Sequence, residues 1–233
     1  MITSLPHDAP PSRGVPDRPL RYGGVVLVGG RSTRMGRPKA WLPVAQRTMA
    51  AAVVESVRQG LRDAGGVSAV RPPMVVVAAT GQDVPPLEDV LITHDRVPDE
   101  GPLRGMEAGF SALASSVDVA FVASCDTPLL KPAVVTRMLL LLGDADAAVP
   151  VVDGRHHPLA AAYRVNLLPR VQALLAARRR RPFFLFQEVA TREVSAEDLR
   201  VSDPELISLR NINTPQEYDA LSIPSGSAGK MEE

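Results

Sequence analysis

Four basic side chains lie in one short glycine-containing segment, which runs from Gly23 to Lys39 with the sequence GGVVLVGGRSTRMGRPK. Its cations are Arg31, Arg34, Arg37 and Lys39, and no carboxylate lies among them. Glycine lets a backbone approach a ligand closely and turn its amide N–H groups toward that ligand. Together with the cations, this pattern favours the binding of a triphosphate.

The same segment matches neither of two common nucleotide-binding fingerprints. It contains no G-x-x-x-x-G-K-[ST] and no G-x-G-x-x-G pattern, which argues against a P-loop NTPase and a nicotinamide dehydrogenase. A glycine-rich turn that carries solvated basic residues is the alternative interpretation. Four cations in one loop make that alternative the weaker of the two.

A carboxylate at Asp126 is the best metal candidate in the sequence. It follows the apolar run Val119–Ala123, and a carboxylate at the end of a strand can hold Mg²⁺ while phosphate oxygens and water fill the other positions. The alternative is that Asp126 caps the turn Asp-Thr-Pro, which is common turn chemistry. The residues alone leave both interpretations open.

Apolar runs alternate with helical patterns along the chain. We predict strands at Val25–Val28, Met74–Ala79, Val90–Thr93, Val119–Ala123, Ala147–Val152, Leu159–Tyr163 and Leu206–Leu209. We predict helices from Thr48 to about Gly65, at Gly105–Ser115, Lys131–Leu142, Leu167–Ala177 and Phe183–Ala190, and a last helix after Pro215.

This alternation predicts an α/β fold, a single Rossmann-like three-layer domain with a mostly parallel, mixed sheet. In such sheets ligands bind beyond the carboxyl ends of the strands. The glycine-rich segment, Asp95 and Asp126 all follow predicted strands, so we expect them to meet at one edge of the sheet.

Length and composition agree with one enzyme-sized domain. The chain has 233 residues, 26 basic and 26 acidic residues, and one cysteine, which suits neither a general nucleic-acid binder nor a disulfide framework. No apolar stretch reaches the ~18–20 residues that span a bilayer. We predict a disordered leader at 1–22, a nucleotidyltransferase domain at 23–222, a flexible tail at 223–233, and a cytoplasmic protein without membrane or nucleic-acid partners.

The motifs together resemble the signature of the MobA-like nucleotidyltransferases, in particular the molybdenum cofactor guanylyltransferases. The first motif is LVGG-x-S-x-RMG-x-x-K, from Leu27 to Lys39. Four more follow in order, over roughly residues 23 to 221: His94-Asp95 before GPLRGM, CDTP at 125–128, HPL at 157–159 and NINTP at 211–215.

The resemblance implies roles for particular residues. It implies transfer of GMP from GTP to molybdenum-bound molybdopterin, with release of pyrophosphate and with Mg²⁺ as cofactor on Asp126. Catalytic roles then fall to Lys39, Arg34 and Asp126. Nucleotide contacts are expected from Leu27, Val28, Gly29, Gly30, Lys39, Asp95, Gly101 and Asp126. Acceptor contacts are expected from Asn211, Asn213 and Arg180, and molybdoenzyme maturation proteins are candidate partners.

One position departs from the family pattern. The family often has an asparagine just after its second strand, where this chain has Ala79, and alanine cannot hydrogen-bond a base through its side chain. The departure weakens the guanine assignment. A cytidylyltransferase, or an NTP transferase with a different phosphorylated acceptor, remains an alternative. So does a nucleotide-binding accessory protein without turnover.

Overall fold

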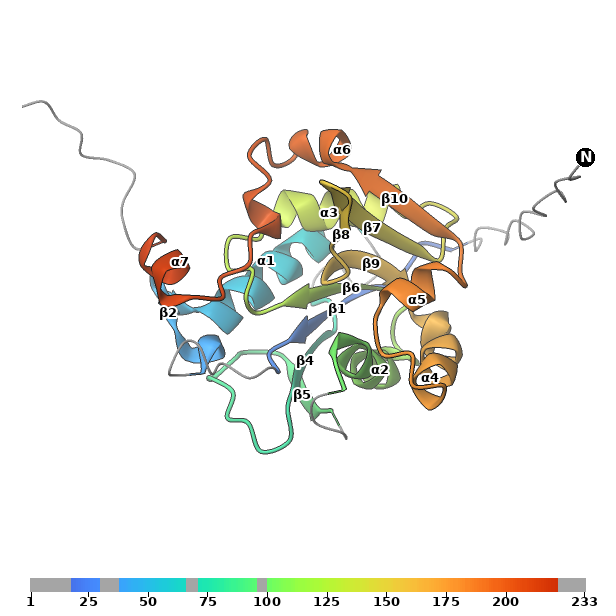
Figure 1. Ribbon diagram of the computed structural model, residues 1–233, viewed down its shortest axis with the longest axis horizontal. Coiled ribbons are helices and arrows are strands. Elements are labelled where there is room, and N and C mark those ends of the chain that lie inside the picture. Colours follow the sequence, from blue (N-terminus) through green and yellow to red (C-terminus); the bar gives the residue numbers. More distant parts are fainter. Residues whose placement is uncertain (1–17, 30–37, 66–70, 96–99, 222–233) are drawn as a thin grey trace, which may run out of the picture.

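The computed structural model describes residues 18–29, 38–65, 71–95 and 100–221, and its strands form a large mixed sheet (Figure 1). Neighbouring strands follow the order β10-β7-β9-β6-β1-β4-β5, with β8 paired to β7. The strands of this sheet are β1 Tyr22–Leu27, β4 Met74–Ala78, β5 Leu91–His94, β6 Val119–Ser124, β7 Ala147–Val152, β8 Arg155–His156, β9 Ala160–Arg164 and β10 Thr191–Ser195. A separate hairpin is formed by β2 Pro43–Val44 and β3 Arg47–Thr48.

Helices cover both faces of this sheet (Figure 1). They are α1 Met49–Asp63, α2 Pro102–Leu113, α3 Pro132–Leu141, α4 Leu168–Ala176, α5 Phe183–Phe186, α6 Ala196–Arg200 and α7 Pro215–Asp219, with 3₁₀ turns η1 Lys39–Trp41, η2 Val165–Leu167 and η3 Ile207–Leu209. One buried core joins α1 and α3 to the sheet, and the other joins α2 and α4 to its opposite face. In the described part, no helix has the length and apolar character needed to cross a bilayer.

The sheet confirms the predicted α/β fold and its mixed, mostly parallel character. Strands β4, β1, β6 and β5 run parallel, whereas β9 is antiparallel to both β6 and β7. Strand residues Val25 and Val26 are fully buried, as expected where helices cover both faces. At Gly60 in α1, an added Cβ would lie 2.6 Å from the Pro132 carbonyl oxygen, so glycine lets α1 and α3 pack closely.

The prediction of a last strand at Leu206–Leu209 is wrong. This segment is the 3₁₀ turn η3, and Leu206 before it has a left-handed φ of 53°. The buried Asp203 carboxylate accepts a 2.7 Å hydrogen bond from the Ser208 N–H, which stabilises a turn in place of a strand. The last strand is β10, and the helix predicted at Phe183–Ala190 ends at Phe186 as α5.

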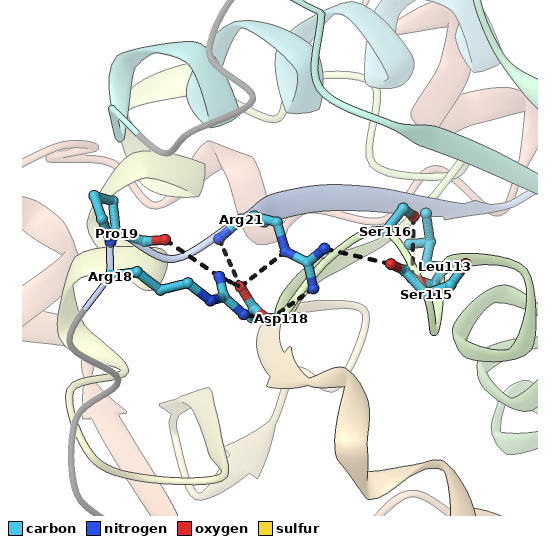
Figure 2. A network of polar contacts seen from close by, with 7 residues as sticks. All are labelled: Arg18, Pro19, Arg21, Leu113, Ser115, Ser116 and Asp118. Carbon is cyan, nitrogen blue, oxygen red and sulfur yellow. Dashed lines mark hydrogen bonds and ion pairs between the residues drawn. The ribbon is translucent and has the colours of Figure 1, made fainter.

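Two arginines that precede β1, Arg18 and Arg21, contact Asp118, the residue that precedes β6 (Figure 2). The Arg18 guanidinium lies 2.7 Å from the Asp118 carboxylate, and Arg21 adds a 3.1 Å ion pair and a 2.9 Å backbone hydrogen bond. These residues fall within the segment that we predicted as a leader. Their contacts attach its end to the sheet. The hydrogen bond from Arg18 lowers the pKa of Asp118 most, and the contacts from Arg21 lower it further. Together they hold this pKa below its ordinary value, although partial burial of the carboxylate raises it.

This network predicts a pH-dependent contribution to stability. The folded-state pKa of Asp118 is lowered, so its stabilisation is present above the unfolded-state pKa of about 3.9 and is lost as pH falls through the folded-state pKa. We expect Asp118→Asn to lower the free energy of unfolding by about 1–2 kcal/mol at pH 7, since Arg18 is half exposed and its pair is screened.

Urea unfolding of wild type and Asp118→Asn between pH 7 and pH 3 measures this difference, which should shrink below about pH 4. The exposed Asp144→Asn serves as the matched control. A difference between wild type and Asp118→Asn that stays constant over this pH range would contradict the prediction.

Candidate active site

The carboxyl ends of four parallel strands bring distant segments together at one edge of the sheet. The Cys125 N–H donates to the Leu27 carbonyl at 2.9 Å, and the Asp95 N–H donates to the Ala78 carbonyl at 3.0 Å. The ends of β6 and β1 are therefore neighbours, as are the ends of β5 and β4. The predicted positions after strands thus lie along one edge. Gly30 and Arg34, which we predicted as nucleotide-binding and catalytic, lie outside the described residues.

Lys39 contacts residues 211–213, which we call the asparagine segment. Its ammonium donates a 2.7 Å hydrogen bond to Oδ1 of Asn213, a residue 174 positions later in the chain. The backbone N–H of Ile212, the residue before Asn213, donates a 2.7 Å hydrogen bond to the Asp126 carbonyl. Lys39, Asn213 and Asp126 are therefore linked through consecutive direct contacts, so the lysine and the aspartate share one region of the molecule.

The surroundings of Cys125 also indicate that Lys39 and Asp126 lie close together. Burial raises the pKa of its thiol to about 12, the Asp126 carboxylate adds to this rise, and the Lys39 ammonium opposes it. Both charges therefore lie close to one thiol. A buried, protonated thiol is a poor nucleophile, so Cys125 packs in the core rather than reacts.

The Asp126 carboxylate has one oxygen that could coordinate a cation. Its Oδ1 is buried and accepts no hydrogen bond in the described part of the chain. Buried carboxylate oxygens normally have partners, and an unmatched one calls for an explanation such as an ion. Among the described residues no group of three or more His, Cys, Asp or Glu side chains could hold a metal, so phosphate oxygens, water and amide oxygens would have to complete a cation site here.

A cavity of about 200 Å³ adjoins Asp126 on the side of β8 and β9. Its polar lining consists of Ser124, Asp126, Thr127, His156, His157 and Asn211. The pKa of His157 is lowered by burial, with smaller contributions from Arg155 and His156, so its imidazole is neutral at pH 7. Asn211 thus lies with Asp126, whereas Asn213 lies with Lys39.

A set of polar contacts joins the turn that precedes Asn211 to Lys131, the residue before α3. The Lys131 N–H donates a 3.0 Å hydrogen bond to the Ser208 hydroxyl while its ammonium lies 2.8 Å from Asp203. Burial opposes ionisation of Asp203, but Lys131 and the Ser208 N–H outweigh it and lower its pKa. These contacts fix the turn η3, which ends two residues before Asn211.

Gly101 and Arg180 lie together at another turn. Gly101 precedes α2 with a φ of 80°, which glycine tolerates best, and an added Cβ would lie 3.6 Å from the Arg180 carbonyl oxygen. The Arg180 guanidinium lies 2.6 Å from Glu100, whose carboxylate also pairs with Arg104. The described residues that line the Asp126 cavity do not include Arg180, so its predicted acceptor contact stays a prediction.

Gln82 is a candidate that sequence reasoning missed. Its side-chain amide donates a 2.8 Å hydrogen bond to the Val28 carbonyl and accepts one of 3.3 Å from the Ala79 N–H. It therefore joins the ends of β1 and β4 next to Gly29 and supplies an amide close to the position where the family asparagine is absent. A glutamine in a loop carries no distinctive sequence signal.

Comparison with known proteins identifies the family of the chain. The model of the MobA-like NTP transferase domain matches residues 24–191. A protein of Mycobacterium ulcerans, named a probable molybdenum cofactor guanylyltransferase, is 36% identical over 205 residues, which cover 86% of this chain and 93% of that protein.

Two solved structures share the fold. Molybdopterin-guanine dinucleotide biosynthesis protein A from Archaeoglobus fulgidus has a TM-score of 0.65 and 23% identity, and the match covers 85% of this chain and 96% of that one. Rv0371c from Mycobacterium tuberculosis, solved in complex with manganese, has a TM-score of 0.51 and 18% identity, with coverage of 80% and 100%. The chain therefore belongs to the MobA-like NTP transferase family, as its motifs predict, and is a nucleotidyltransferase.

Proposed function

We propose that this protein transfers GMP from GTP to the terminal phosphate of molybdenum-bound molybdopterin and releases pyrophosphate. The observation that carries the proposal is the contact chain from Lys39 through Asn213 and Ile212 to Asp126 at the carboxyl edge of the sheet. These contacts bring a cation and a carboxylate to the edge of the sheet where ligands bind in folds of this kind, which supports a polyphosphate site there. The printed name of the 36% identical relative supports this choice of donor and acceptor.

The residues present can support this chemistry without a covalent intermediate. A phosphate monoester oxygen of the acceptor forms a bond to the α-phosphorus of GTP. The bond from that phosphorus to the bridging oxygen breaks, and pyrophosphate leaves with the bonding electrons. Because both reactants are anionic, catalysis depends on alignment and on neutralising their repulsion. We assign charge neutralisation on the pyrophosphate side to the Lys39 ammonium.

We propose that Asp126 holds the Mg²⁺ ion that this reaction needs. Its buried Oδ1 without a partner in the described structure fits such an ion, and Asn211, which lines the same cavity, offers a neutral oxygen. Mg²⁺ sites commonly use one or two carboxylates and complete their shell with phosphate and water. When bound, the ion would offset negative charge on the phosphates.

The remaining site assignments belong to the same proposal. Nucleotide contacts are assigned to the segment from Leu27 to Gly30, to Asp95 and to Gly101, and Arg34 joins Lys39 in catalysis. The single domain at 23–222, a cytoplasmic location and contact with molybdoenzyme maturation proteins are also proposed. The lone buried cysteine agrees with a reducing compartment.

Pyrophosphate release measured separately with GTP, CTP, ATP and UTP tests the proposal, with molybdenum-bound molybdopterin as acceptor under anaerobic conditions. We expect GTP to exceed the other nucleotides by at least about tenfold in kcat/KM, since a base-edge hydrogen-bonding site discriminates strongly. Preference for CTP would favour a cytidylyltransferase instead. Nucleotide binding without pyrophosphate release from any acceptor would indicate an accessory protein.

A further inference from the structure

The order of the strands puts different groups on the two sides of Asp126. It follows β6, which has β1 on one side and β9 on the other. Lys39 belongs to the segment that follows β1. The cavity of about 200 Å³ lies on the other side, against β8 and the start of β9. Asp126 thus lies between the side that carries Lys39 and the side that holds the polar cavity.

This separation matches a geometric need of phosphoryl-type transfer. The attacking oxygen and the leaving oxygen lie roughly in line, on opposite faces of the reacting phosphorus. Under the proposed function, on which this inference rests, the pyrophosphate leaves on the Lys39 side. The acceptor must then approach from the cavity side of Asp126.

The cavity is too small for a whole cofactor. Pockets that enclose a drug-sized ligand have volumes of ~300–1,000 Å³, whereas this one has about 200 Å³. Its lining includes the His157 imidazole and the Asn211 amide, and both can donate hydrogen bonds to a phosphate oxygen. The cavity therefore suits the phosphate end of an acceptor, and the rest of the acceptor must lie on its rim.

An aromatic group adjoins the cavity through His156. The His156 ring, which lines the cavity, is stacked on Phe186 with centroids 5.4 Å apart and contacts the edge of Phe183 at 5.8 Å. Phe186 in turn stacks at 6.4 Å on Tyr163, which is fully buried. We call His156, Phe183 and Phe186 the aromatic shelf.

The aromatic shelf is held rigidly and remains open to solvent. Nε2 of His156 lies 3.0 Å from the Glu193 carboxylate on β10, which fixes the orientation of the ring. Phe183 is 47% exposed. An exposed aromatic side chain fixed beside a polar cavity offers an apolar face to a flat conjugated ring, since offset and edge-on ring contacts are favourable.

We propose that the acceptor binds with its phosphate in the Asp126–His157 cavity and with a flat conjugated heterocycle on the aromatic shelf. The acceptor class is then a phosphate monoester attached to a planar ring system. A sugar phosphate does not satisfy both halves of this site. Phe183 and His157 determine acceptor affinity and leave nucleotide affinity unchanged.

Steady-state kinetics of the full chain test this proposal, with KM measured separately for GTP and for molybdenum-bound molybdopterin. Phe183→Leu keeps an apolar side chain but removes the ring, and we expect it to raise the acceptor KM about 5- to 50-fold. Phe183→Tyr keeps the ring and should restore the wild-type value within about twofold. His157→Gln should raise the acceptor KM about 3- to 10-fold. The KM for GTP should not change in any of these variants.

A binding measurement without nucleotide separates this proposal from the proposed function. Quenching of 6-methylpterin fluorescence by wild-type protein should be seen and should be lost in Phe183→Leu. The control Leu140→Ala, exposed on α3, should behave as wild type, and circular dichroism verifies folding of each variant.

Two results would overturn the site while leaving the proposed function intact: an unchanged acceptor KM in both Phe183→Leu and His157→Gln, or an equal rise in the KM for GTP. Pterin binding that depends on Phe183, in a wild-type protein that releases no pyrophosphate from GTP, would instead overturn the function and keep the site. Absence of both pterin binding and turnover would overturn both.

Discussion

Replacing Asp126 by asparagine is expected to lower kcat/KM for pyrophosphate release by about 10³-fold, because a metal-held phosphate contributes several kcal/mol to transition-state stabilisation. The same change should leave the melting temperature unchanged or raise it. The buried Oδ1 accepts no hydrogen bond in the described structure, so the substitution removes no hydrogen bond that the described residues make to this oxygen.

Mg²⁺-dependent thermal stabilisation gives a second readout of this change. A ligand that binds the folded state raises stability in proportion to the logarithm of its concentration over Kd. With GTP present, added Mg²⁺ should raise the melting temperature of wild type and of the exposed control Asp144→Asn, but not of Asp126→Asn. Near-normal turnover in Asp126→Asn would remove Asp126 from the proposed site.

Replacing Lys39 by methionine should lower kcat by about 10²- to 10³-fold, as loss of one preorganised charge at the reacting phosphates does in other enzymes. The side chain is half-buried and its ammonium bonds Asn213 at 2.7 Å. Methionine keeps much of the aliphatic length, so folding should persist. Stopped-flow or coupled pyrophosphate assays with saturating GTP measure kcat directly.

Lys39→Arg is the matched variant for charge. Arginine keeps the positive charge but has a planar, larger head group, so it is not equivalent to lysine at a close contact. We expect its activity to lie between those of wild type and Lys39→Met. If Lys39→Met raised only the KM for GTP and kept kcat, the lysine would bind the ground state and transition state equally, and its catalytic role would be lost.

The central strands could be predicted from sequence because burial on both faces leaves a strong apolar signal. The fully buried residues of β4 and β6 form uninterrupted apolar runs. Strand β10 escaped prediction because it lies at the edge of the sheet and Val194 is its one buried residue. Periodicity of apolar residues carries little information in such a strand.

The turn at Leu206–Leu209 shows a different limit. Its apolar residues indicate a strand, but the buried Asp203 carboxylate, which pairs with Lys131 72 positions away, accepts the Ser208 N–H and so stabilises another conformation. A tertiary contact of this kind overrides local preference. Sequence patterns do not report it.

The sequence indicates which edge of the sheet the candidate residues share but not which of them touch. Parallel strands that end at one edge place Asp95 and Asp126 there by topology alone. The Lys39–Asn213 hydrogen bond and the aromatic shelf depend on segments that are far apart in the chain. The resemblance to the family pointed to Lys39 and Asn213 separately, but their pairing emerged only from the structure.

The most direct test of the account is a crystal structure of the protein with Mg²⁺ and a non-hydrolysable GTP analogue. We expect one bound nucleotide with a phosphate oxygen within hydrogen-bond distance of the Lys39 ammonium. We also expect one Mg²⁺ ion to contact both this nucleotide and the Asp126 carboxylate. A nucleotide whose phosphates lie away from both side chains would contradict the account.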